Sequence, residues 1–222
     1  MTITAIQQPT LFFIRHGKLA LPYENHAAMP REVLVALGLK KLNPSVEKKY
    51  IDKQMQLFLK SSIPLANIQR IYTSPSRRCI ETGNQLSDYI KKTNGQRIKQ
   101  VVSPNLREIY FELDKILHSR PAPSNTDSLN NAIISAMSTA HFCESADSGL
   151  LRITSFFAEL HDFSKPAIIV AHDFIMRIVE LFIRHRGTAT YQITIDDLLS
   201  TQRNDYLRGF ATDSRFAFLK KI

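Results

Sequence analysis

The stretch LFFIRHG, residues 11–17, joins four apolar residues directly to Arg15, His16 and Gly17. Two further strand-like segments occur at residues 68–72 and 167–171, and each is also followed by polar residues. Strands that are buried on both faces of a parallel sheet have continuous apolar sequences of this kind. Because helical patterns lie between the segments, the sequence predicts an α/β fold with a mostly parallel central sheet.

The remaining secondary structure is predicted from periodicity and composition. Helices are expected at residues 45–59, 76–92, 150–160 and 174–183. The segment 118–131 is rich in Pro, Ser and Asn, and this composition predicts a loop or the edge of an insertion. The run 216–222 predicts an edge strand that its lysines protect from pairing with other chains.

Composition excludes several classes of protein. The chain has 222 residues, 44% hydrophobic and 22% charged, which excludes disordered, collagen-like and membrane-spanning proteins. The net charge of +9 is uneven: residues 1–111 carry 17 basic and 7 acidic side chains, whereas residues 112–222 carry 12 and 13. The basic excess therefore belongs to the N-terminal half, where it can steer anionic ligands.

The two cysteines, Cys79 and Cys143, form neither a disulfide framework nor a metal-binding spacing. No basic segment precedes the first apolar run, and no apolar stretch approaches 18 residues. We expect a cytoplasmic protein without membrane insertion, although secretion without a cleaved signal would leave no mark in the sequence. No nucleic-acid-binding motif is present, so no nucleic-acid partner is expected.

Three polar clusters follow the three predicted strands. They are Arg15-His16-Gly17, SPSRR at residues 74–78, and His172-Asp173. Ligands of open α/β sheets bind beyond the carboxyl ends of the strands. If the strands are neighbours, two histidines and at least two arginines converge on one pocket.

This set of side chains suits a phosphate ester. Arginine binds phosphate oxygens with two parallel hydrogen bonds, and its charge lowers the pKa of a neighbouring histidine. A neutral imidazole can then attack phosphorus, provided that a hydrogen bond to its other nitrogen fixes the tautomer. The leaving alkoxide needs a proton, so a carboxylic acid is expected within reach.

Four segments resemble motifs of the histidine phosphatase superfamily, the phosphoglycerate-mutase-like proteins. FIRHG at residues 13–17 resembles the opening motif, and YTSPSRRCIET at 72–82 is similar to the family's SSPLxRAxxT segment. LREI at 106–109 resembles the segment with the acidic residue, and IVAH at 169–172, with Arg177 five residues on, resembles the second histidine motif. Four motifs in one order are far more specific than RHG alone.

The resemblance implies one domain over residues 1–222. Its fold would be a three-layer α/β/α sandwich, with a variable helical or loop insertion at about 112–150 over the active site. The family needs neither a metal nor another cofactor. The oligomeric state does not follow from the resemblance.

The resemblance also implies a role for each matched residue. His16 would be phosphorylated, and Arg15, Arg78 and His172 would bind the transferring phosphoryl group. Glu108 would protonate the leaving group and then activate water to hydrolyse the phosphohistidine. These roles describe a phosphatase that acts on a phosphomonoester, either a small molecule or a phosphopeptide.

The sequence departs from the family pattern at the acid. His172 is followed by Asp173, and a His-Asp pair here resembles the acid-phosphatase branch, in which the aspartate donates the proton. Asp173 is therefore a second candidate for the proton donor. The Ser-Pro segment and the short chain favour the mutase-like branch, and with it Glu108.

Two further departures affect the activity. Residues 110–115 lack the Gly-rich basic continuation of true mutases, which favours a phosphatase over a phosphoglycerate mutase. Lys18-Leu19 stands where the family usually has Glu-Thr, so polar contacts to a substrate are missing there. This change supports a third hypothesis, a catalytically weak protein that binds phosphorylated ligands.

Overall fold

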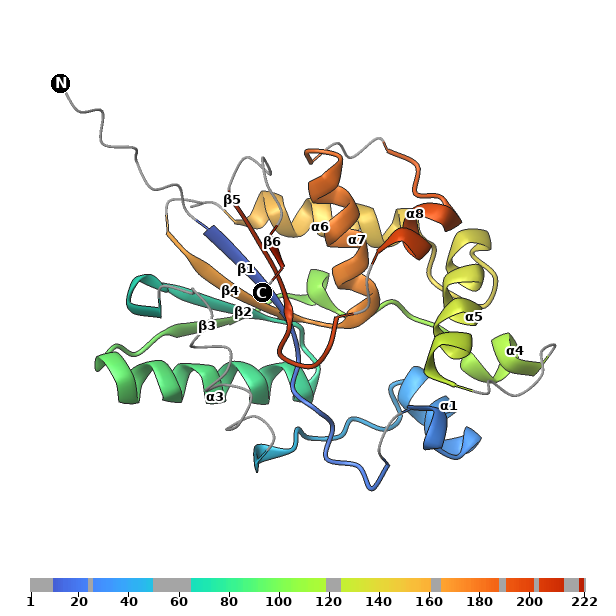
Figure 1. Ribbon diagram of the computed structural model, residues 1–222, viewed down its shortest axis with the longest axis horizontal. Coiled ribbons are helices and arrows are strands. Elements are labelled where there is room, and N and C mark those ends of the chain that lie inside the picture. Colours follow the sequence, from blue (N-terminus) through green and yellow to red (C-terminus); the bar gives the residue numbers. More distant parts are fainter. Residues whose placement is uncertain are drawn as a thin grey trace.

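A six-stranded sheet forms the centre of the molecule in the computed structural model (Figure 1), which describes residues 10–23, 26–49, 65–118, 125–160, 165–187, 191–201, 204–213 and 220–221. The strand order is β3-β2-β4-β1-β5-β6. The strands are β1 Thr10–Arg15, β2 Arg70–Thr73, β3 Lys99–Val102, β4 Ala167–Ala171, β5 Gly209–Asp213 and β6 Lys220–Lys221.

The first four strands are mutually parallel where they pair, and β5 and β6 are antiparallel additions at one edge. The predicted strands at 11–14, 68–72 and 167–171 are confirmed as β1, β2 and β4. Of the predicted edge strand at 216–222, only residues 220 and 221 belong to the described part of the chain, and they form β6. Strands β3 and β5 were not predicted, since β3 is a short, half-exposed edge strand without an apolar run.

Helices cover both faces of the sheet, which confirms the three-layer α/β/α fold (Figure 1). The described helices are α1 Arg31–Gly38, α3 Arg77–Asn94, α4 Leu113–His118, α5 Thr126–Thr139, α6 Ala146–Glu159, α7 Asp173–Arg184 and α8 Ile195–Ser200. Helix α3 lies on one face, and α6 and α7 lie on the other. No helix among the described residues is both long and apolar enough to span a lipid bilayer.

The side chains of the sheet alternate between two apolar cores. Phe13 and Ile169 point toward the core under α6 and α7, whereas Ile14 and Val170 point toward the core under α3. All four side chains are fully buried. Residues 11–15 of β1 and all residues of β4 are therefore shielded on both sides, as the continuous apolar sequence predicts.

The predicted helices at 76–92, 150–160 and 174–183 correspond to α3, α6 and α7. Most of the predicted helix at 45–59 lies outside the described residues.

The predicted loop at 118–131 is wrong from Thr126 onward, where α5 begins. The side chain of Asn125 accepts a hydrogen bond from the backbone N–H of Ser128. The hydroxyl of Ser128 in turn accepts one from the backbone N–H of Asn125. The polar residues that indicated a loop thus form a helix cap, and burial of Leu129 and Ile133 stabilises the turns that follow.

Gly209 provides a test of the sheet. A methyl group at this position would lie 1.8 Å from the carbonyl oxygen of Phe13, so β5 can approach β1 only with glycine there. We expect Gly209→Ala to lower the free energy of unfolding by about 3 kcal/mol. Gly95→Ala is the matched control: its methyl group meets no atom within 4 Å, and only its positive φ opposes alanine, at a cost of about 1 kcal/mol.

Urea denaturation of both variants measures the difference. Equal losses of stability would contradict the inferred close contact between β1 and β5.

Candidate active site

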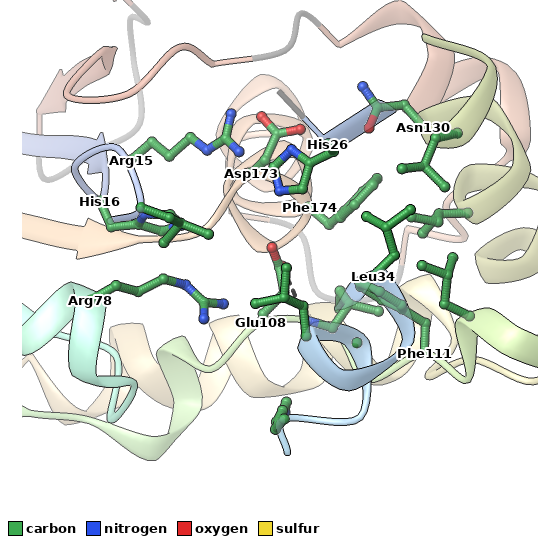
Figure 2. A pocket seen from close by; sticks show the side chains of 18 residues that line it. Arg15, His16, His26, Leu34, Arg78, Glu108, Phe111, Asn130, Asp173 and Phe174 are labelled. Atoms are coloured by element: carbon green, nitrogen blue, oxygen red, sulfur yellow. Dashed lines mark hydrogen bonds between the residues drawn. The ribbon is translucent and has the colours of Figure 1, made fainter. Parts of the chain in front are cut away.

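Parallel pairing brings the three polar clusters to one edge of the sheet. Arg15 at the end of β1 is in register with Ala171 of β4, and Thr73 at the end of β2 is in register with Val170. The rings of His16 and His172 consequently lie 5.2 Å apart, measured between centroids. Figure 2 shows the cluster at the end of the strands, with Arg15, His16 and Arg78 together on one side of the pocket.

His16 is almost completely buried, with 4% of its surface exposed. Its Nδ1 lies 2.8 Å from the carbonyl oxygen of Gly17. Because a carbonyl can only accept, Nδ1 carries the hydrogen, and the lone pair of the neutral ring is on Nε2. Burial first, and then the charges of Arg78 and Arg15, hold the pKa of His16 well below 6.5. The imidazole is therefore neutral at pH 7, with its tautomer fixed.

His172 is neutral for the same reasons: burial, followed by the charge of Arg78, lowers its pKa well below 6.5. Nε of Arg78 donates to Nδ1 of His172 over 3.2 Å. The hydrogen of His172 is thus on Nε2, which donates to the hydroxyl of Ser74 over 2.8 Å. Both ring nitrogens of His172 are engaged, and one of them orients Arg78.

Arg15 is fixed by the loop that precedes β5. Its Nη1 donates to the backbone carbonyl of Asn204 over 2.8 Å, and its guanidinium lies 4.4 Å from the ring centroid of Tyr206. Its Nε is buried, and no described atom pairs with it. A buried arginine with an unpaired donor beside the cavity is suited to bind an anion.

The two arginine-containing segments are connected through Thr82. The backbone N–H of Gly17 donates to the hydroxyl of Thr82, which in turn donates to the carbonyl oxygen of Arg78. Arg77, by contrast, is exposed and pairs with Glu81 one turn along α3. The structure thus places Arg78 at the pocket and Arg77 on the surface.

Two helices begin at the pocket. Ser76 precedes α3, and His172 precedes α7, so the N-termini of both helices face the cluster of cations. The partial positive charge of a helix N-terminus favours a bound anion. Arginine side chains and helix ends therefore act in the same direction.

Glu108 is the first of two carboxyl groups beside the histidines. Its Oε1 accepts hydrogen bonds from the backbone N–H groups of Ile109 and Ile175, both over 3.1 Å. No described residue donates to its other oxygen, Oε2. Burial and the charge of Asp173 raise the pKa of Glu108 above its usual value. Glu108 thus combines an oxygen that no described residue contacts, Oε2, with a raised pKa.

Asp173 has a different environment. Its Oδ2 accepts from Nε and Nη2 of Arg177, both over 3.2 Å, and its Oδ1 accepts from the backbone N–H of Asn204 over 2.9 Å. Both Arg177 donors thus reach the same oxygen of Asp173, and Asn204 occupies the other. Since Asn204 also accepts from Arg15, Asp173 belongs to a buried chain of contacts that ends at Arg15.

The pocket has a charged end and an apolar end. The space open to water-sized molecules is about 100 Å³. Arg15, His16, Arg78, Glu108 and Asp173 line the charged end. Helices α1, α4, α5 and α7 and the segment after Glu108 supply the apolar lining, so two helices within residues 112–150, α4 and α5, lie against the site.

The predicted site residues Arg15, His16, Arg78, Glu108, His172 and Asp173 all lie around the same pocket and its neighbouring cavity. Sequence reasoning missed Asn204 and Tyr206, which hold Arg15, and Lys40, which lies between the two cavities. No motif includes these three residues. They lie in loops that are distant in sequence from the segments with the predicted site residues.

Lys18 and Leu19, where the sequence departs from the family pattern, have ordinary structural contacts. Lys18 forms an ion pair with Glu47 over 3.4 Å, and Leu19 is buried and lines the pocket. The apolar residue thus contributes to the shape of the pocket instead of leaving a polar gap.

Several solved structures share the fold of this chain. Mycobacterial glucosyl-3-phosphoglycerate phosphatase superposes with a TM-score of 0.59 at 14% identity, covering 96% of both chains. Phosphoglycerate mutase from Bacillus anthracis gives 0.57 at 16% identity, covering 98% of this chain and 94% of the other. Alpha-ribazole phosphatase from Shigella flexneri gives 0.54 at 15% identity, covering 96% and 94%. At such identities the likeness establishes the fold alone.

Among curated proteins, none matches this chain. The model of the histidine phosphatase superfamily (branch 1) matches residues 53–203, a region that contains Arg78, Glu108 and His172. The match covers more than half of the sequence, and the chain therefore belongs to the histidine phosphatase superfamily.

Proposed function

We propose that this protein is a metal-independent phosphatase that hydrolyses a phosphomonoester through a phosphohistidine on His16. The observation that carries the proposal is the state of the His16 ring: it is neutral, its Nδ1–H is held by Gly17, and its Nε2 lone pair is free for attack. Arg15 and Arg78, which lower its pKa, also supply charge to hold the phosphoryl group.

In the first step, Nε2 of His16 attacks phosphorus. The N–P bond forms as the P–O ester bond breaks, and the proton of Glu108 passes to the leaving alkoxide. Arg15 and Arg78 stabilise the negative charge on the non-bridging oxygens in the transition state. His172 contributes to phosphate binding by orienting the guanidinium of Arg78.

In the second step, the Glu108 carboxylate takes a proton from water. The water oxygen bonds to phosphorus as the N–P bond breaks, and inorganic phosphate is released. His16 returns to its neutral form and Glu108 to its acid form, so the cycle closes with no other group.

The hydrogen bonds distinguish the two candidate acids. Both oxygens of Asp173 accept hydrogen bonds, one from Arg177 and the other from Asn204, so neither is open toward a leaving group. Glu108 has a raised pKa and an open Oε2. We therefore assign the acid to Glu108 and a positioning role to Asp173, which fixes Asn204 and through it Arg15.

Hydrolysis of an aryl phosphate in the presence of EDTA tests the phosphatase. His16→Ala is expected to lower kcat by about 10³-fold or more, because it removes the nucleophile. Arg78→Ala is expected to lower kcat/KM by about 10²-fold, since it removes transition-state charge stabilisation. Arg77→Ala is the matched control; its surface ion pair is dispensable, and activity should stay within about twofold of the wild type.

Undiminished turnover in His16→Ala would contradict the mechanism. Phosphoryl transfer to an added acceptor in excess of hydrolysis would indicate a mutase-type phosphotransferase. Phosphate binding without turnover would indicate a catalytically weak anion-binding protein.

The assignment of the acid predicts a dependence on the leaving group. Glu108→Gln should slow an alkyl phosphate, whose alkoxide needs a proton, about tenfold or more beyond its effect on p-nitrophenyl phosphate. At a pH low enough to keep Glu108 protonated in both proteins, Asp173→Asn should slow both substrates by the same factor, because it displaces Arg15; the loss of the charge that helps to raise the pKa of Glu108 matters only at higher pH. The opposite pattern in these two variants would assign the proton to Asp173.

The pH dependence provides a second readout of the same residue. Catalysis needs neutral His16 and protonated Glu108. Because the pKa of Glu108 is raised, its acid form persists to higher pH than an ordinary glutamic acid, and kcat/KM falls as pH rises through that pKa. This alkaline decrease should be absent in Glu108→Gln when each variant is compared with the wild type on the same alkyl phosphate.

A further inference from the structure

The pocket continues beyond the two carboxyl groups into an apolar compartment. We define this compartment by Leu34, Leu37, Phe111, Leu129, Ile133 and Phe174, which line it from helices α1, α5 and α7 and the loop before α4. The rings of Phe111 and Phe174 meet edge to face, with centroids 6.0 Å apart. The walls therefore come from several packed elements of the fold.

The position of the compartment identifies the part of a substrate that it can hold. In phosphoryl transfer the leaving oxygen lies opposite the attacking atom, so it faces away from His16. In Figure 2, Glu108 and Phe174 lie between His16 and Arg78 on one side and Leu34 and Phe111 on the other. The group attached to the leaving oxygen thus extends into the apolar compartment.

Few polar groups face this space. Among the described residues, Asn130 and His26 line it, and Lys40 lies where it adjoins a second cavity. The second cavity is polar and basic, with Asn43 and Arg107 in its lining, but it does not include His16. Of these two cavities, as the described residues line them, the one with the apolar compartment contains both the nucleophile and the acid.

Building on the proposed function, we infer that the substrate is a phosphomonoester of a compact, uncharged and largely apolar alcohol. An apolar wall offers nothing to replace the water bound by hydroxyl or carboxylate groups, so sugar phosphates and phosphoglycerates lose affinity there. Apolar carbons gain affinity from the same burial. The amide of Asn130 can satisfy one hydrogen-bonding group on such an alcohol.

The test compares three substrates of the intact protein: hexyl phosphate, glucose 6-phosphate and 3-phosphoglycerate. The first two are six-carbon esters of primary alcohols that differ in polarity, and the third carries a carboxylate. We expect kcat/KM for hexyl phosphate to exceed the other two values by about tenfold or more. Equal values, or a preference for either polar substrate, would overturn the inference.

A pair of variants with the same chemical change locates the preference. Leu37→Asn places an amide in the apolar compartment and should lower the ratio of kcat/KM for hexyl phosphate to that for glucose 6-phosphate by about fivefold. Leu151→Asn is the control, because Leu151 is 64% exposed on α6 and does not line the pocket; its ratio should equal that of the wild type. An unchanged ratio in Leu37→Asn would also count against the inference.

The same experiment separates this inference from the proposed function. Turnover that depends on His16 but favours glucose 6-phosphate or 3-phosphoglycerate would overturn the inference and leave the phosphatase intact. Absence of His16-dependent turnover with all three substrates and with p-nitrophenyl phosphate would overturn both. The wild-type comparison decides the question even if Leu37→Asn does not fold.

Discussion

The parallel pairing of β1 with β4 determines where the chemistry of this protein can take place. These strands run side by side through the middle of the sheet, buried on both faces, and their ends are held in register at Arg15 and Ala171. Arg15-His16 and His172-Asp173, which are more than 150 residues apart in sequence, are thereby fixed beside each other. A shift of register by one residue would turn Arg15 away from the pocket and His16 out of reach of His172.

The cost of this arrangement is electrostatic. Two arginines and two helix N-termini concentrate positive charge around groups that are mostly buried, and this charge, added to desolvation, keeps both histidines neutral. The loop before β5 reduces the electrostatic repulsion at the site, because the carbonyl of Asn204 and the ring of Tyr206 both interact favourably with the Arg15 guanidinium. An anion would offset the remainder, so the same feature that destabilises the ligand-free site favours phosphate binding.

The features that could be predicted from the sequence are those encoded locally. Apolar segments followed by polar clusters indicated β1, β2 and β4, and with them the convergence of His16, Arg78 and His172. The supports of the site were not predictable, since Asn204, Tyr206 and Lys40 reach it through long-range packing. The same holds for α5: the caps and the buried face were present in the sequence, but only contact with other elements distinguishes such a segment from a polar loop.

Glu108 and Asp173 show why environment, and not residue type, assigns roles within the site. Both carboxyl groups lie by the first turn of α7, where the helix end favours negative charge. Arg177 and Asn204 hold both oxygens of Asp173, and burial together with the charge of Asp173 raises the pKa of Glu108. The different surroundings of the two carboxyl groups thus suit Glu108, and not Asp173, to the proposed role of proton donor. In the proposed mechanism, Asp173 consequently acts twice without touching the substrate: it fixes Arg15 through Asn204, and its charge adds to the effect of burial in raising the pKa of Glu108.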